Sequence, residues 1–244
     1  MLLEGTTLGR PPEDTCSSEA EVEIVMAGAF EETPGLALVY ASVMNIDRLV
    51  TIYRAALRSK RILILDLYAA SVLRATANPK IPQAEWERVR VYLPASQKWA
   101  VVGARAYEHC RSFAPRRVYP EDLAGMAGQS VMLFRTSMVA ELEDAGCLTG
   151  ARLIYSLWPG YLKDEKQKPF LQWLEESAIS WIVFHTSGHA PAADLFRMVE
   201  ALRPESVVPI HTEVPERYAC LCEKVQVRAD REWWAVGGPG KFAN

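Results

Sequence analysis

The sequence predicts an α/β fold with a parallel sheet, because buried strands alternate with amphipathic helices along the chain. Residues 36–41 (L-A-L-V-Y-A) form the first expected strand, and residues 61–67 (R-I-L-I-L-D-L) form the second. Between them Asn45 is placed to cap a helix whose apolar stripe is Ile46, Leu49, Val50, Tyr53 and Leu57. With 244 residues, of which 50% are hydrophobic, the chain can bury a sizeable core.

The same patterns continue through the rest of the chain. Further strands are expected over 89–93, 130–134, 151–156 and 181–184, and further helices over 69–77, 104–113 and 169–177. Residues 11–23 are polar and acidic and are expected to form a linker. Residues 224–227 and 233–236 could add edge strands, and the glycine-rich residues 237–241 are expected as a flexible tail because they lack the spacing of a phosphate loop.

Two histidines near the C-terminus indicate a functional site. His189 and His211 are 22 residues apart, which is enough for one helix and one strand to return the chain to the same sheet edge. Leu195, Met198, Val199 and Leu202 predict that helix, and residues 206–210 predict the strand, with Pro209 at a sheet edge or strand end. Three of the four histidines fall between 185 and 211, and imidazole is the commonest metal ligand. A hydrogen-bonded structural role is the alternative for each histidine taken singly.

These residues carry a family resemblance. The run His185–Ala190 (H-T-S-G-H-A), a helix, and then Val208–Glu213 (V-P-I-H-T-E) resemble the C-terminal motifs of the β-CASP branch of the metallo-β-lactamase-fold nucleases, which includes RNase J-like enzymes and the mRNA 3′-end-processing endonuclease. Glu4, in L-L-E-G-T-T, resembles the acidic residue that opens the inserted domain of that family. The resemblance implies an α/β parallel-sheet β-CASP domain plus the C-terminal strand-helix-strand portion of a metallo-β-lactamase fold.

The resemblance also implies a chemistry for these residues. In the family two zinc ions activate a hydroxide that hydrolyses RNA phosphodiester bonds. His211 would be a zinc ligand, His189 would donate to a phosphate oxygen, and Glu4 would orient an imidazole. A histidine at the position of His211 accompanies RNA substrates in this family, so RNA is the expected partner. Asn45 and Arg48 stand where the family approaches the RNA backbone, although Asn45 is an equally good helix-start residue. Together with His185, Ser187 and Gly188 they are weaker candidates for substrate binding.

The principal zinc ligands of the family are not present. They form an H-x-H-x-D-H run in a lactamase half before the inserted domain, whereas the first histidine here is His109. The resemblance therefore implies the C-terminal portion of such a ribonuclease, lacking the N-terminal half and incomplete as an enzyme on its own. The alternatives are a non-catalytic α/β module that binds RNA or another partner, and a mononuclear zinc site built from His185, His189 and His211.

By the same resemblance we expect three segments: residues 1–15 as the end of the lactamase part, 16–179 as the β-CASP domain, and 180–244 as the returning lactamase portion. The net charge of −3 excludes a basic surface for nucleic acid over the whole molecule, so RNA would bind in a local groove. The five cysteines are an odd number without regular spacing, which indicates reduced thiols and a cytoplasmic protein. No membrane span is expected, and a homodimer stays open.

Overall fold

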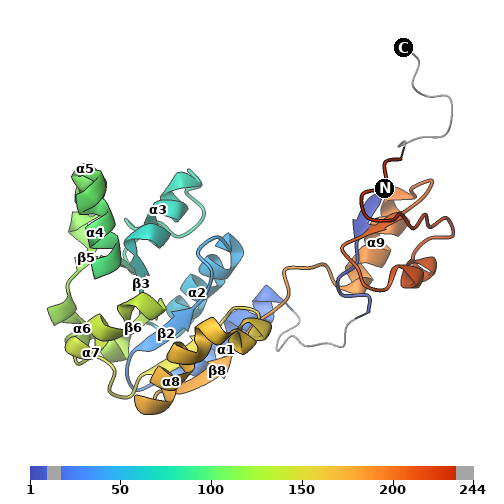
Figure 1. Cartoon of the computed structure of the whole chain (residues 1–244). Helices are drawn as coiled ribbons and strands as arrows, with labels where there is room; N and C mark the ends of the chain where they lie inside the picture. Colours follow the sequence, from blue (N-terminus) through green and yellow to red (C-terminus); the bar gives the residue numbers. More distant parts are fainter. Residues whose placement is uncertain (10–17, 235–244) are drawn as a thin grey trace. The chain divides into compact units, whose positions relative to one another are not determined.

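The structure is a computed structural model that describes residues 1–9 and 18–234. It divides into two compact units (Figure 1). The larger unit comprises residues 14–186, and the smaller unit combines residues 1–13 with residues 187–244. Both ends of the chain therefore contribute to one small unit, and the α/β unit is the long segment between them.

A seven-stranded parallel sheet forms the larger unit, in the order β5-β4-β3-β6-β2-β7-β8. The strands are β2 (Ala37–Tyr40), β3 (Ile62–Asp66), β4 (Val89–Tyr92), β5 (Arg117–Val118), β6 (Ser130–Leu133), β7 (Arg152–Tyr155) and β8 (Ser180–Val183). The predicted α/β parallel-sheet fold is thus confirmed, and six of the seven strands agree with the sequence expectation to within one or two residues, whereas the short edge strand β5 was not expected.

Helices cover both faces of this sheet. On one face pack α1 (Glu19–Glu32), α2 (Ile46–Arg58) and α3 (Leu67–Ala75), and on the other α6 (Pro120–Met126), α7 (Val139–Asp144) and α8 (Lys168–Glu176). Along β2, Ala37 and Val39 pack in the hydrophobic core under α1, α2 and α3. Leu38 packs in the core on the opposite face, under α6, α7 and α8. A strand that is buried on both faces has no polar side, which explains the continuous apolar runs in the sequence.

Helix α1 corrects the expected linker. Residues 18–23 form the start of this helix, with the side chain of Ser18 accepting a hydrogen bond from the Glu21 amide. The acidic residues that suggested a linker occupy the first helical turn, where carboxylates interact favourably with the helix dipole. Val22, Met26 and Phe30 face the sheet from this helix and are fully buried. The remaining expected linker residues, 11–17, lie outside the described residues.

Arg48 of α2 connects α1 with the carboxyl end of β7, and through Ser156 with the carboxyl end of β8. It is only 1% exposed, and its guanidinium donates to the Glu19 carboxylate of α1 at 2.7–3.1 Å. The same group donates to the Ser156 carbonyl oxygen, 3.1 Å away, at the end of β7. Ser156 in turn donates its hydroxyl to the Phe184 carbonyl just after β8. The guanidinium therefore stabilises the larger unit from inside.

The smaller unit contains two parallel strands and one helix. Strand β1 (Leu2–Glu4) pairs with β9 (Val208–Ile210), and the register places Glu4 opposite Ile210. Helix α9 (Ala192–Leu202) precedes β9 and buries Leu195 and Val199. A 3-10 helix, η6 (Pro215–Cys220), adds the buried Tyr218 to the same core. Pro209 lies in β9, which is an edge strand because this sheet has two strands, so the expected sheet-edge position of Pro209 is confirmed.

Several sequence expectations need correction. Strand β8 pairs with β7, so the larger unit ends at residue 186 instead of residue 179. The larger unit begins at residue 14 instead of residue 16. The helix expected over 104–113 is two helices, α4 (Ala95–Ala104) and α5 (Tyr107–Arg111), because Arg105 adopts a left-handed φ of 54° and ends α4. Of the expected edge strands, only an isolated bridge from Val207 to Val225 forms in the described part, and residues 235–241 lie outside it.

Candidate metal-binding and RNA-contact site

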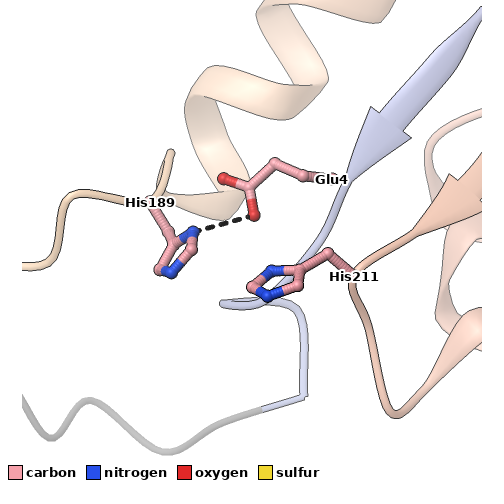
Figure 2. A group of neighbouring side chains, drawn as sticks. All are labelled: Glu4, His189 and His211. Atoms are coloured by element: carbon pink, nitrogen blue, oxygen red, sulfur yellow. Dashed lines mark hydrogen bonds and ion pairs between the residues drawn. The ribbon is translucent and has the colours of Figure 1, made fainter.

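Three segments of the smaller unit bring Glu4, His189 and His211 together (Figure 2). Glu4 is the last residue of β1, and His211 directly follows β9, the strand that pairs with β1. His189 lies in the loop before α9. The two imidazole centroids are 5.2 Å apart, and their planes differ by 32°. A helix and a strand do separate the two histidines, but they do not return to one sheet edge: β8, the strand before His189, belongs to the seven-stranded sheet, and β9, the strand before His211, pairs with β1.

The Glu4 carboxylate accepts hydrogen bonds from three other residues of the site. Its Oε2 accepts from His189 Nδ1 at 3.1 Å, from the Thr6 hydroxyl at 2.8 Å and from the Thr6 amide at 3.3 Å. Its Oε1 accepts from the Ala190 amide at 3.0 Å. Glu4 therefore holds the loop before α9 through two hydrogen bonds, one from the Ala190 amide and one from the His189 imidazole. The family resemblance implies this orienting role of Glu4 on an imidazole, and the geometry is compatible with it.

Opposing effects act on the pKa of Glu4. Partial burial raises this pKa, whereas hydrogen bonds from Thr6 and Ala190 and the charge of His189 lower it, and together the lowering effects prevail. Glu4 therefore stays an anion and an acceptor over a wider pH range than a free glutamate. An anionic acceptor at this place favours the tautomer of His189 that carries its proton on Nδ1.

Thr6 connects Glu4 to the second histidine. Its hydroxyl oxygen lies 2.7 Å from His211 Nδ1 and 2.8 Å from Glu4 Oε2. His211 itself has a left-handed backbone with φ of 50°, so the chain turns sharply where it leaves β9. Sequence analysis missed Thr6. The signal that could have found it is a hydroxyl two residues after the carboxylate, at the end of the same strand.

Gly5 lies between Glu4 and Thr6 and packs closely on Tyr218. A Cβ atom at Gly5 would lie 2.1 Å from the Tyr218 hydroxyl oxygen and 2.6 Å from Cζ. Tyr218 is fully buried and donates its hydroxyl proton to the Leu3 carbonyl at 2.9 Å. Burial, together with the nearby Glu4 carboxylate, raises the pKa of Tyr218 to about 12, so the phenol remains a donor. This contact requires glycine in the sequence E-G-T.

Gly5→Ala is expected to loosen the site. The added methyl group must displace Tyr218 or the end of β1, and overpacking of this kind costs about 1–2 kcal/mol. Equilibrium urea unfolding, combined with hydrogen exchange of the 1–9 segment, measures the loss. Gly188→Ala is the matched control, because nothing lies within 4 Å of a Cβ atom at that exposed position. Equal stability of the two variants would contradict the close contact with Tyr218.

The donor set suits a divalent metal. Glu4, His189 and His211 each offer one ligand atom, and these atoms all lie within 4.8 Å of one another. Imidazole nitrogens and a carboxylate oxygen are ligands that Zn²⁺ takes in proteins, and a catalytic zinc takes three protein ligands. The donor types of the group therefore fit zinc, while Glu4 Oε2 and His189 Nδ1 are already hydrogen-bonded to each other at 3.1 Å. His211 is the exposed member of the group, so a ligand can reach it from solvent.

The weaker candidates are divided between the two units. Ser187 and Gly188 lie beside His189, and the Ser187 hydroxyl accepts from the His189 amide at 3.1 Å. Asn45 caps α2 by accepting from the Arg48 amide at 2.9 Å. His185 belongs to the larger unit, and the group of metal donors found among the described residues contains Glu4 in its place. Arg48 is corrected: its guanidinium is buried and bonded, so it is a structural residue and not a substrate contact.

Fold and site together define an α/β protein with a histidine–carboxylate centre suited to a metal ion. Residues 181–230 match the family model described as "Zn-dependent metallo-hydrolase RNA specificity domain", and this segment contains His189 and His211. This segment is thus similar to the RNA-specificity domain of the zinc-dependent metallo-hydrolases, which is consistent with a β-CASP/metallo-β-lactamase-fold nuclease. Among curated proteins the comparison finds no match.

A solved structure shares the fold. It is the crystal structure of a protein of unknown function from Enterococcus faecalis V583, with a TM-score of 0.65 and 18% sequence identity. The similarity covers 94% of this chain and 49% of that chain. The present chain therefore spans about half the length of the solved protein, with both of its units included in the match. In the described part of the present chain, no helix is long and apolar enough to cross a bilayer.

Proposed function

We propose that this chain is the RNA-recognition and C-terminal portion of a zinc-dependent ribonuclease of the β-CASP type. The observation that carries the proposal is the convergence of His189 and His211, both inside the matched RNA-specificity segment, on the carboxylate of Glu4. In this proposal His211 supplies an imidazole ligand for zinc, Glu4 and His189 act beside it, and the family description supplies RNA as the substrate class.

Each residue has a distinct task in this proposal. His211 would hold zinc through Nε2, the ring nitrogen that Thr6 does not contact. Glu4 accepts the Nδ1 proton of His189 and thereby directs the opposite edge of that ring away from itself (Figure 2). His189 Nε2 is then available to a phosphate oxygen of the RNA. Bound zinc supplies Lewis acidity and lowers the pKa of water.

Zinc titration of the full chain tests the proposal. Wild-type protein is expected to bind Zn²⁺ weakly, because His211 is the one zinc ligand that the proposal assigns to this chain. His211→Ala is expected to weaken this binding by more than the roughly 10–100-fold that loss of an outer-shell partner costs. His109→Ala is the matched control, because His109 is an exposed histidine of the larger unit that contacts Ser71. A wild-type chain without zinc affinity, or a His211→Ala variant that keeps it, would contradict the proposed metal role.

The RNA part of the proposal has its own measurement. Fluorescence anisotropy with a labelled single-stranded RNA is expected to show weaker binding for His189→Ala than for wild type, because an imidazole contact to phosphate is lost. The His109→Ala variant should bind this RNA as wild type does. Binding of RNA by a chain that takes up no zinc would favour the alternative of a non-catalytic RNA-binding module.

A further inference from the structure

Thr6 occupies a special position in the site because its hydroxyl contacts both Glu4 and His211. The side-chain oxygen is 2.8 Å from Glu4 Oε2, 2.7 Å from His211 Nδ1 and 3.2 Å from the His211 carbonyl oxygen. Thr6 is only 7% exposed, so water has little access to this oxygen. Its hydrogen bonds must therefore be made within the protein.

One hydroxyl proton has to serve these neighbours. Glu4 Oε2 and the His211 carbonyl oxygen can only accept, and the charged Glu4 oxygen is the nearer of the two, at 2.8 Å against 3.2 Å, so Thr6 donates its proton to Glu4. A donation to His211 Nδ1 instead would place two oxygen lone pairs against each other at 2.8 Å. With the proton on the Glu4 side, Thr6 can only accept from His211. The 2.7 Å contact is then a bond from His211 Nδ1–H to the Thr6 oxygen.

This direction determines the tautomer of His211. Which ring nitrogen carries the proton depends on the hydrogen bond that the other ring nitrogen makes. A proton held on Nδ1 leaves the lone pair on Nε2, and only a nitrogen with a lone pair can ligate a metal ion. Figure 2 shows the two rings of the site beside the Glu4 carboxylate. His189 is held by Glu4 directly, and His211 is held by Glu4 through Thr6.

We infer that Thr6 is a positioning residue: by relaying a hydrogen bond from His211 to Glu4, it holds His211 in the Nδ1–H tautomer and presents Nε2 as a metal ligand. The inference deepens the proposed function, since the importance of the tautomer rests on zinc binding by His211. Glu4 then serves both histidines, which explains why a single carboxylate lies between two imidazoles.

The ¹⁵N signals of His211 test the inference directly. In metal-free full-length protein labelled at histidine, at a pH above the ordinary histidine pKa, His211 is expected to show a protonated Nδ1 and an unprotonated Nε2. Its signals are assigned by their loss in His211→Gln. Thr6→Val keeps the shape of the side chain but removes the hydroxyl, and is expected to leave His211 exchanging between both tautomers. Thr6→Ser keeps the hydroxyl and is expected to retain the wild-type tautomer.

Thr7→Val is the matched control for this experiment. The Thr7 hydroxyl donates to the Ala190 carbonyl at 2.7 Å, so the variant loses one hydrogen bond in the same unit without removing a bond to His211. Its tautomer should be that of wild type. In zinc titrations Thr6→Val is expected to bind about 10–100-fold more weakly than wild type, the loss typical of an outer-shell partner, while Thr6→Ser stays close to wild type.

The outcomes separate this inference from the proposed function. A wild-type His211 with its proton on Nε2, or a Thr6→Val variant with an unchanged tautomer, would overturn the role of Thr6 even if zinc binds. A wild-type chain with the expected tautomer and no zinc affinity would overturn the metal role and leave the hydrogen-bond relay in place. Loss of the tautomer in Thr7→Val as well would show a general loosening of the unit, and this would also overturn the specific role of Thr6.

Discussion

Arg48→Met is expected to lower the free energy of unfolding of the larger unit by about 3 kcal/mol. Removing one partner of a buried ion pair costs about 3–5 kcal/mol because the other charge stays uncompensated. Here the lower end applies, since the Glu19 side chain is 34% exposed and water can hydrate its carboxylate. The variant also leaves the Ser156 carbonyl without its guanidinium donor. Urea unfolding followed by circular dichroism measures the change.

Arg54→Met is the control for this prediction. Arg54 lies on the same helix, its side chain is 65% exposed, and its contact with Glu23 is 3.9 Å long. Glu23 is buried but keeps its shorter bond to Arg58 at 2.5 Å when Arg54 is replaced, and a long contact to an exposed arginine contributes about 0–1 kcal/mol, so Arg54→Met should be close to wild type. Comparable losses in the two variants would contradict the structural role of the buried guanidinium.

The Arg48 effect should also depend on pH. Burial raises the pKa of Glu19, but hydrogen bonds from Arg48 and Thr51 and the charge of Arg48 lower it further than burial raises it. A carboxyl whose folded pKa lies below its ordinary value of 4.5 stabilises the fold above that pH. This stabilisation is lost as pH falls through the folded pKa. The stability difference between wild type and Arg48→Met should therefore be constant near neutral pH and shrink in acid.

Glu4→Gln is expected to disturb the site more than its small change in shape suggests. Every neighbour that contacts the carboxylate donates to it: Ala190 on Oε1, and Thr6 and His189 on Oε2. A glutamine must direct its NH₂ group toward one of these donors, whichever way the amide is turned. A donor left without its acceptor lowers the free energy of unfolding by about 1–3 kcal/mol. Because Glu4 would no longer hold His189 and Thr6 in place, the zinc affinity should fall about 10–100-fold.

Glu200→Gln removes the same charge from an exposed position on α9 and provides the comparison. It should unfold and bind zinc as wild type does. Isothermal titration calorimetry with Zn²⁺ and hydrogen exchange of the segment around His189 distinguish the two variants. A Glu4→Gln protein that matched Glu200→Gln in both measurements would contradict the role of Glu4 as the common acceptor.

Much of the larger unit could be predicted from the sequence because its information is local. Runs such as Leu36–Ala41 are apolar on both faces only when helices cover both sides of a sheet, so the pattern alone indicated a parallel α/β fold. Helix α1 was not predicted because the charged residues of its first turn, read with the polar residues before them, resemble a linker. Its buried stripe of Val22, Met26 and Phe30 was the signal that could have corrected this.

The sequence by itself determined the strand and helix alternation, the family resemblance, and the expectation that His189 and His211 meet in one site. Only the tertiary structure decided what surrounds them. Pairing of β1 with β9 brings Glu4 and Thr6 to histidines about 200 residues away, and a contact of that range has no local periodicity to reveal it. The direction of the Thr6 hydrogen bond depends on distances between three side chains. The burial of Arg48 likewise depends on its packing against Glu19 and Ser156, and so could not be read from a helix pattern.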